Sequence, residues 1–146
     1  MKKDTRKLPS KRIWILIIIA LIPFFLFQNK HLVITNYTYE SDKLSPDLDG
    51  YRIVQISDLH NATFGKNNRK LLDAIKSCSP DMIVLTGDLV DSNHTNVKRA
   101  VSFVEQAVTI APVYYVTGNH EYWLTSTDRQ QTLQGILSAG AIDLDN

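Results

Sequence analysis

The chain has 146 residues, a formal net charge of +1, 44% hydrophobic residues and 21% charged residues. These values are typical of a globular protein, and they exclude a disordered acidic or basic tail protein. The single cysteine, Cys78, excludes an internal disulfide framework and any zinc module built from several cysteines. The length allows one domain of ordinary size or a part of a larger domain.

The near-neutral net charge hides an uneven distribution along the chain. Residues 1–12 contain six of the sixteen basic residues but only one of the fifteen acidic residues. The rest of the chain therefore carries ten basic and fourteen acidic residues, which is a net charge of −4. This mildly acidic body argues against nucleic acid as a partner, because nucleic-acid-binding surfaces are basic.

An apolar segment follows the basic tail. Residues 13–27 read IWILIIIALIPFFLF and contain no charged residue. A helix of this length spans ~22 Å, which is short for a hydrocarbon core of ~30 Å. Three interpretations stay open: an uncleaved signal anchor, a cleaved signal peptide and a buried core helix. Because no small-residue cleavage site follows and the segment has no polar face, we favour a transmembrane signal anchor over residues 13–30.

The basic tail also predicts how such an anchor is oriented. Basic residues flanking a membrane segment stay on the cytoplasmic side. We therefore expect residues 1–12 to form a basic cytoplasmic tail. Residues 32–146 are expected outside the cell membrane, attached to it by a single pass.

The chain after residue 30 alternates between predicted strands and predicted helices. Residues 31–49 are expected to hold a leading strand, over residues 33–39, and a turn. Further strands are predicted over residues 52–57, 82–86, 113–117 and 141–144, and helices over residues 67–79, 96–109 and 130–138. The runs MIVLT and VYYVT are almost wholly apolar, which is typical of strands buried on both faces.

This order predicts an α/β fold. Residues 50–146 read as βαβαβα, which indicates right-handed crossovers and a largely parallel sheet in one domain. The sequence ends where a fourth strand, over residues 141–144, is beginning. We therefore expect an unpaired sheet edge and an uncovered apolar face.

A polar cluster follows each of the first three strands of the repeat. The clusters are Ser57-Asp58-Leu59-His60, Gly87-Asp88-Leu89-Val90-Asp91 and Gly118-Asn119-His120-Glu121. Asp58 precedes Asp88 by 30 residues, and Asp88 precedes Asn119 by 31. Since each step equals one βαβ unit, all three clusters are expected at the carboxyl edge of neighbouring parallel strands, where open α/β folds bind ligands.

The residue types in these clusters suit a divalent metal. Asp58, His60, Asp88 and Asn119 offer carboxylate, imidazole and amide ligands, a set that fits Mn, Fe, Zn or Mg. Asp58 and His60 are two residues apart, so on an extended strand end their side chains would lie on the same side. A carboxylate on the middle strand, Asp88, can bridge two metals ~3.5–4 Å apart. A lone Asp at a strand end is usually a cap or a turn residue, but three clusters at matching edges are difficult to explain in that way.

The ordered combination D-x-H, G-D-x-x-D and G-N-H-E resembles the calcineurin-like metallophosphoesterase family, specifically its membrane-anchored bacterial branch. The resemblance covers residues 50–146, the amino-terminal half of that family's domain. It implies the βαβαβα start of a β-sandwich that is flanked by helices. It also implies hydrolysis of a phosphomonoester, phosphodiester or pyrophosphate bond by a hydroxide that two divalent metals activate.

The resemblance also implies roles for individual residues. Asp58 and His60 would bind the first metal, Asp88 would bridge, and Asn119 would bind the second metal. His120 would not be a ligand but would assist the leaving group, and Asp91 matches the acid that orients this histidine in some members.

The later motifs of the family, an isolated histidine and G-H-x-H, do not occur in this sequence, and no histidine follows His120. We therefore expect a truncated domain, or fragment, with an incomplete metal site. The alternative to an active enzyme is a non-catalytic, membrane-tethered, metal-binding remnant. A membrane anchor beside the site would make a lipid or envelope-derived phosphoester a plausible substrate.

Overall fold

The computed structural model describes residues 11–28 and 31–145, with the side chains of the first helix described up to residue 22. The chain divides into two compact units, residues 1–33 and residues 34–146. The first ten residues of the basic tail, which is predicted over residues 1–12, lie outside the described residues.

Among its described residues, the first unit contains one helix, α1 (Lys11–Gln28). Its described apolar side chains are exposed around the whole helix, with Leu16 and Ile19 at 65% and 60%. In the part of the chain that the structure describes, no helix has both the length and the hydropathy that crossing a membrane requires. The transmembrane span predicted over residues 13–30 is thus without structural support.

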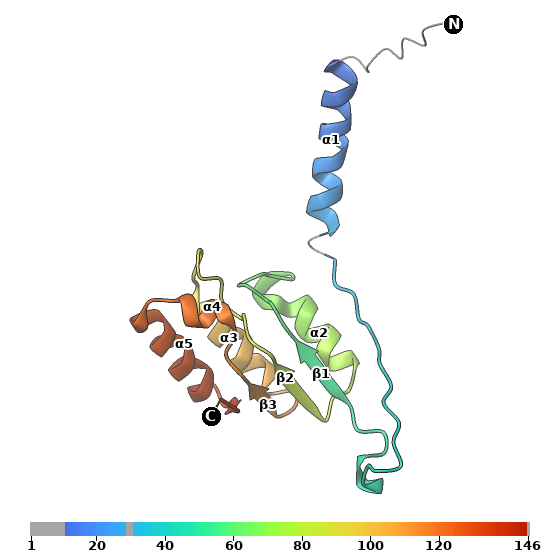
Figure 1. The fold of residues 1–146 in the computed structure, drawn as a ribbon, viewed down its shortest axis with the longest axis vertical. Helices are drawn as coiled ribbons and strands as arrows, with labels where there is room; N and C mark the ends of the chain where they lie inside the picture. The colour runs from blue at the N-terminus through green and yellow to red at the C-terminus, as the bar shows by residue number, and fades with distance from the viewer. Residues whose placement is uncertain (1–10, 29–30, 146) are drawn as a thin grey trace, which may run out of the picture. The chain divides into compact units, whose positions relative to one another are not determined.

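The second unit is built on a parallel sheet of four strands in the order β1-β2-β3-β4 (Figure 1). The strands are β1 (Ile53–Ile56), β2 (Met82–Leu85), β3 (Val113–Tyr115) and β4 (Ile142–Asp143). The helices are α2 (Arg69–Ser77), α3 (Val97–Ala107), α4 (Asn119–Trp123) and α5 (Ser126–Ser138), with 3-10 turns at Pro46–Leu48 and Lys66–Asn68. The predicted α/β class and parallel sheet are confirmed, and they fit a metallophosphoesterase fold.

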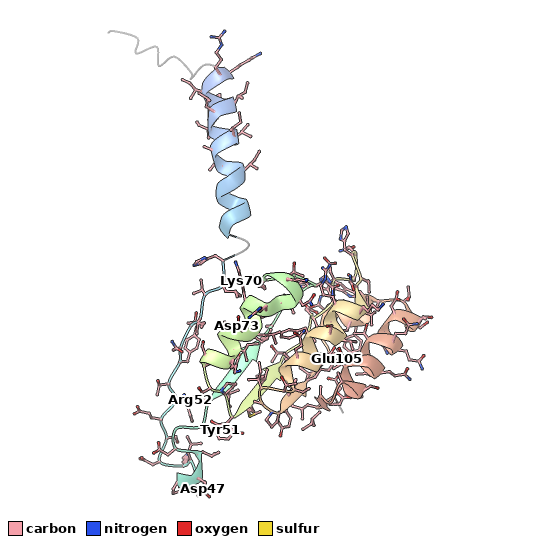
Figure 2. The ribbon with its side chains drawn as sticks, turned by 180° about the vertical axis from the view of Figure 1, so that it is seen from behind. Asp47, Tyr51, Arg52, Lys70, Asp73 and Glu105 are labelled. Carbon is pink, nitrogen blue, oxygen red and sulfur yellow. The ribbon has the colours of Figure 1, made fainter. Side chains whose placement is uncertain are left out.

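The core lies on one face of this sheet. Strands that are neighbours in both chain order and space, joined by right-handed crossovers, place their connecting helices on the same face. The strand residues of that face are buried together with one stripe of each helix: Ile83, Leu85, Val113, Tyr115, Leu71, Leu72, Ile75, Phe103, Val104 and Ile136. On α2, Lys70 and Asp73 point away from this core and are exposed (Figure 2).

The opposite face of the sheet is only partly covered within the described chain. Along β2 and β3, buried residues alternate with half-buried ones, so the prediction that these strands are buried on both faces is wrong. Ile53 is 58% exposed on this second face. Met82, Val84 and Tyr114 on the same face are half-buried, so the apolar face that the sequence analysis expects to be uncovered is partly covered within the described residues. The described residues form one sheet and not the two sheets of a sandwich.

Two predicted elements differ from the structure. Residues 33–39 have no regular secondary structure, and Tyr37 in this segment is 91% exposed. Residues with high strand propensity form a strand only where another strand pairs with them, so propensity alone was misleading. Helix α5 begins at Ser126 and not at residue 130, because the Thr125 hydroxyl accepts a hydrogen bond from the Asp128 N–H and caps the helix.

This cap gives a test of the second unit's stability. We expect Thr125→Ala to lower the free energy of unfolding by about 1 kcal/mol, because the Asp128 N–H loses its partner at the helix start. Urea unfolding followed by circular dichroism measures the change. The matched control is Thr127→Ala, an exposed threonine in the first turn of the same helix, which should change stability by less than about 0.5 kcal/mol. Equal losses for both variants would contradict the capping role.

Candidate metal centre

Three loops leave the carboxyl ends of β1, β2 and β3 side by side. The first two loops continue the pairing of their strands, since the His60 N–H donates to the Asp88 carbonyl at 2.8 Å and the Asn61 N–H to the Leu89 carbonyl at 2.9 Å. The third loop leads directly into α4, whose first residues are Asn119 and His120. The three polar clusters of the sequence therefore meet at one edge of the sheet, as predicted from their spacing.

The backbone of these loops is not extended. Asp58, His60 and Asp88 all have positive φ angles, of 55°, 45° and 53°. The expectation that Asp58 and His60 sit on an extended strand end is wrong, because β1 already ends at Ile56. Left-handed backbone at residues other than glycine costs roughly 1 kcal/mol or more each, and such strain concentrates at functional sites.

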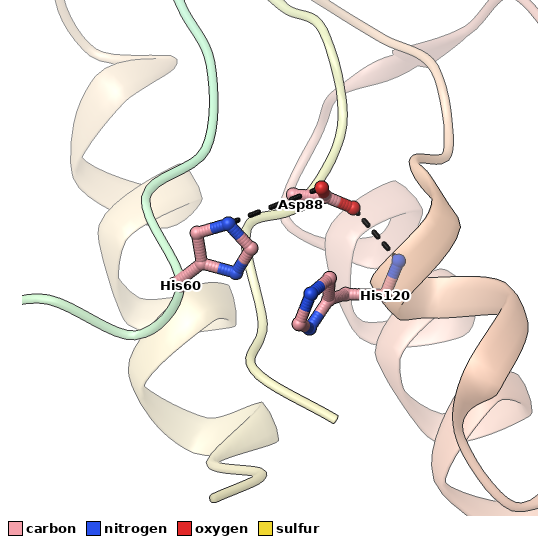
Figure 3. A group of neighbouring side chains, drawn as sticks. All are labelled: His60, Asp88 and His120. Carbon is pink, nitrogen blue, oxygen red and sulfur yellow. Dashed lines mark hydrogen bonds and ion pairs between the residues drawn. The ribbon is translucent and has the colours of Figure 1, made fainter. Parts of the chain in front are cut away.

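Side chains from all three loops converge in spite of this strain. His60, Asp88 and His120 each offer one ligand atom, and these atoms lie within 4.8 Å of one another (Figure 3). His60 Nε2 is 3.9 Å from Asp88 Oδ2, and the His60 and His120 rings meet edge to face with centroids 4.3 Å apart. Asp88 is buried, and both histidines are partly exposed. Imidazole nitrogen and carboxylate oxygen at this spacing are suitable ligands for a divalent ion.

The other two predicted ligands are at the solvent side of the cluster. Asp58 Oδ1 is 3.7 Å from His60 Nε2, and the Asp58 side chain is 64% exposed. The hydroxyl of Ser57 donates a hydrogen bond to the Asp58 carboxylate. Asn119 is exposed at the first position of α4. The structure thus brings Asp58 to the cluster, whereas the ligand role of Asn119 stays a prediction.

The hydrogen bonds of His120 define which ring nitrogen carries the proton. Its Nδ1 accepts the Ser92 backbone N–H at 3.1 Å, with the Ser92 hydroxyl at 3.2 Å. A backbone N–H can only donate, so Nδ1 is an acceptor and the neutral ring is protonated at Nε2. The predicted orienting residue, Asp91, lies farther from Nδ1, with its Oδ1 at 3.8 Å, beyond hydrogen-bond distance. Sequence reasoning missed Ser92, whose contact comes from its main chain.

Asp91 lies beside His120 and is a carboxylate with a lowered pKa. The backbone N–H of Asn93 donates to Asp91 Oδ1 at 2.8 Å and holds the pKa of the Asp91 carboxyl below its ordinary value. His94 and His120 contribute to the same shift. The lowered pKa keeps the Asp91 carboxyl ionised at neutral pH, with its Oδ1 3.8 Å from His120 Nδ1.

Glu121 is a second residue that the sequence analysis did not assign. It is 1% exposed and its carboxylate accepts four backbone N–H groups from two loops. The donors are Asp88 and Gly118 to Oε2, both at 2.8 Å, and Leu89 and Val90 to Oε1, at 2.8 and 3.3 Å. Its place three residues after Gly118, where a glutamate often caps a helix start, is the signal that could have identified it.

Asn61 is a buried residue whose hydrogen bonds connect two of the loops at the site. Its side-chain oxygen accepts the backbone N–H groups of Asp91 and Asn96, at 3.1 and 3.0 Å. Its amide nitrogen donates to the Asn96 carbonyl at 3.0 Å. Arg99 donates to the Asn61 carbonyl at 2.7 Å. These bonds connect the loop that carries His60 to the loop that carries Asp91, and the position directly after His60 was the only indication in the sequence.

A parallel sheet with imidazole and carboxylate groups at the carboxyl ends of three adjacent strands is the arrangement of a metal-dependent α/β hydrolase. Residues 51–143 match the family model of the calcineurin-like phosphoesterases. The chain therefore belongs to this family, which confirms the resemblance read from its motifs.

Several curated proteins are similar to the chain. An uncharacterized metallophosphoesterase of Bacillus subtilis, YkoQ, is 26% identical over 90% of this chain and 50% of its own length. A "transmembrane protein with metallophosphoesterase domain" of Danio rerio is 30% identical over 60% of this chain and 20% of its own. The "UDP-2,3-diacylglucosamine pyrophosphatase LpxG" of Chlamydia trachomatis is 34% identical over 62% of this chain and 29% of its own.

The chain thus spans between about a fifth and a half of the length of these relatives. No solved structure matches the chain with statistical significance.

The contact between the second and third loops can be tested at Gly118. A Cβ atom at this position would overlap the Asp88 carboxylate and its backbone nitrogen. We expect Gly118→Ala to lower the free energy of unfolding of the metal-free chain by about 1–3 kcal/mol, as overpacking does. The control is Asn119→Ala, which changes the exposed neighbour and should shift stability by less than about 0.5 kcal/mol. Similar urea midpoints for Gly118→Ala and the unaltered chain would contradict the close approach.

Proposed function

We propose that this site hydrolyses phosphoester bonds with the help of divalent metal ions. The observation that carries the proposal is the convergence of His60, Asp88 and His120 at the carboxyl edge of the sheet. Membership of the calcineurin-like phosphoesterase family supports it.

The spacing of the ligand atoms supports metal binding. Two atoms bound at about 2.1 Å to one ion, at tetrahedral or octahedral angles, are about 3.0–3.5 Å apart. His60 Nε2 lies 3.7 Å from Asp58 and 3.9 Å from Asp88, so small side-chain movements would bring all three to one ion. We propose these residues as the first metal site, and Asp88 with Asn119 as the second. Because the second site has only two ligands, one of them a neutral amide, we expect it to be the weaker one.

The chemistry is divided between the ions and the chain. When bound, divalent ions supply a Lewis acid and lower the pKa of water, so that a nucleophile forms near neutral pH. His120 contributes a hydrogen-bond donor for the leaving oxygen, because the Ser92 N–H occupies Nδ1 and directs the proton to Nε2. We propose that Asp91 assists through its negative charge beside the ring, since its Oδ1 lies 3.8 Å from His120 Nδ1.

The proposed substrate class is based on one named relative and on helix α1. One relative is named a UDP-2,3-diacylglucosamine pyrophosphatase, which is a hydrolase of a lipid-derived pyrophosphate. The apolar helix α1 on the same chain would hold the protein near lipid. We therefore propose a phosphoester or pyrophosphate that is derived from a lipid or from the cell envelope.

Metal binding and turnover test the proposal together. With Mn²⁺ and a generic aryl phosphate, we expect slow, chelator-sensitive hydrolysis and one tightly bound ion per chain. Asp88→Asn should lose both metal and activity. His120→Ala should keep the metal but slow turnover by roughly 10²–10⁴, the range for a lost acid–base group. The control is His31→Ala, since this exposed histidine lies outside the cluster.

Each failure in this experiment has a separate meaning. Loss of metal in His120→Ala would make this residue a ligand and contradict its proposed role. Tight metal binding without turnover would contradict the phosphoesterase and favour a non-catalytic metal-binding remnant. Fast turnover with two tightly bound ions would contradict the ligand count for the second site.

We also propose that α1 attaches the chain to a membrane. Its described side chains from Ile13 to Ile22 are apolar and exposed on all sides, as expected for a surface that contacts lipid. Two relatives are named transmembrane proteins. The orientation proposed is the one predicted from the basic tail, with residues 32–146 on the outer side of the cell membrane.

Fractionation of bacterial cells that express the full chain tests this attachment. We expect the chain in the membrane pellet after an alkaline carbonate wash. The double variant Ile15→Lys, Ile19→Lys, which places two charges one turn apart on α1, should move it to the supernatant. The control Tyr37→Lys, at an exposed position outside the helix, should stay in the pellet. Protease added to spheroplasts should digest residues 32–146, and protection from it would overturn the orientation.

A further inference from the structure

We propose that Glu121 is a positioning residue of the metal centre. Its buried carboxylate fixes the backbone of Asp88 and thereby directs the Asp88 carboxylate toward the ligand cluster. The inference deepens the proposed function and rests on the metal site that this function includes.

The first observation is the unusual environment of the Glu121 charge. A buried carboxylate is normally compensated by a cation. Among residues 11–28 and 31–145, no lysine, arginine or histidine forms an ion pair with Glu121. Four backbone N–H groups take this place, two on each carboxylate oxygen. Hydrogen bonds to an ionised acceptor are about twice as strong as neutral ones, so the four together compensate the charge.

The second observation is that two of these donors belong to the loop that aims Asp88. Asp88 has a left-handed backbone, with φ of 53°, which other interactions must maintain. The Asp88 and Leu89 N–H groups are both held by Glu121 at 2.8 Å. Glu121 therefore fixes the orientation of the strained peptide units from which the Asp88 side chain projects.

The Asp88 side chain is held at its other end as well. Its Oδ1 accepts the His120 N–H at 2.8 Å, which leaves Oδ2 on the side of His60, 3.9 Å from Nε2. Figure 3 shows this arrangement, with Asp88 between the two histidines. A Cβ atom on Gly87 would overlap the backbone of Gly118, so the two loops are in direct contact where Glu121 joins them. Any rotation of the Glu121 carboxylate would therefore move a metal ligand.

The donor pattern also explains why a glutamine could not replace Glu121. Glutamine has nearly the same shape, but one of its two terminal groups is an NH₂ that can only donate. In this position the NH₂ would face two N–H donors, and at least two of the four hydrogen bonds would be lost. Each buried donor left without a partner is costly. Aspartate keeps the charge and both acceptors, but its carboxylate is one methylene shorter.

The decisive measurement is the Mn²⁺ affinity of the folded chain of residues 1–146. We expect Glu121→Gln to weaken Mn²⁺ binding by roughly 10–100-fold, the range for residues that orient metal ligands without touching the metal. Glu121→Asp should lose less, because it keeps the charge. The control is Glu105→Gln, which makes the same chemical change at an exposed position of α3 and should leave the affinity unchanged (Figure 2).

A purely structural role predicts a different result. Circular dichroism and gel filtration establish which fraction of each variant is folded, and affinity is calculated for that fraction alone. A lower unfolding temperature with unchanged Mn²⁺ affinity in folded Glu121→Gln would overturn the proposal. A Glu105→Gln loss of the same size would overturn it too, because the effect would then come from net charge.

If Glu121→Gln does not fold, hydrogen exchange on the unaltered chain tests the positioning role of Glu121. Without metal, we expect the Asp88, Leu89 and Gly118 amides to exchange slowly although they lie outside the strands, compared with the exposed loop amide of Thr63. Mn²⁺ should slow exchange at Asp88 further and not at Thr63. Rapid exchange at Asp88 and Gly118 without metal would overturn the role of Glu121. Absence of Mn²⁺ binding to the unaltered chain would overturn the proposed metal site instead.

Discussion

The parallel order β1-β2-β3 is the constraint on which the rest of the site depends. In a parallel sheet, strands that are neighbours in space end at the same edge, so the residues that follow them become neighbours although about 30 positions separate them in the chain. The crossover helices needed for this topology lie on one face and bury the core there. The other face and the carboxyl edge are therefore left for other contacts, and the carboxyl edge holds the polar clusters.

Backbone strain at this edge is offset by hydrogen bonds between the loops. Asp58, His60 and Asp88 all adopt left-handed backbone, which is costly for residues with a side chain. The loops carry on the ladder of β1 and β2 beyond the strands, through bonds from His60 to Asp88 and from Asn61 to Leu89. Each such bond contributes about 0.5–1.5 kcal/mol, which is comparable to the cost of one strained residue. The site is thus held in one conformation by its neighbours and not by its own backbone preferences.

The electrostatics of the edge favour a cation. Asp58, Asp88 and Asp91 bring three carboxylates close to His60 and His120, while the buried Glu121 adds a fourth negative charge behind them. Burial raises the pKa of the Tyr115 hydroxyl, and the charges of Glu121 and other carboxylates, Asp88 among them, raise it further. A divalent ion would neutralise much of this negative charge, which is the physical basis for the proposed metal centre.

The sequence by itself determined the parallel strands, the crossover helices and the edge where the polar clusters meet, because these depend on local patterns and their spacing. The apolar runs at 82–86 and 113–117 and the amphipathic helices between them predicted the parallel sheet, and the equal spacing of Asp58, Asp88 and Asn119 predicted a shared edge. Tertiary structure decided what depends on partners distant in the chain. Residues 33–39 form no strand since no strand pairs with them among the described residues. The left-handed backbone of the ligand loops, the Ser92 N–H at His120 and the four donors around Glu121 arise only when the three loops pack together, and the identity of single residues does not encode such contacts.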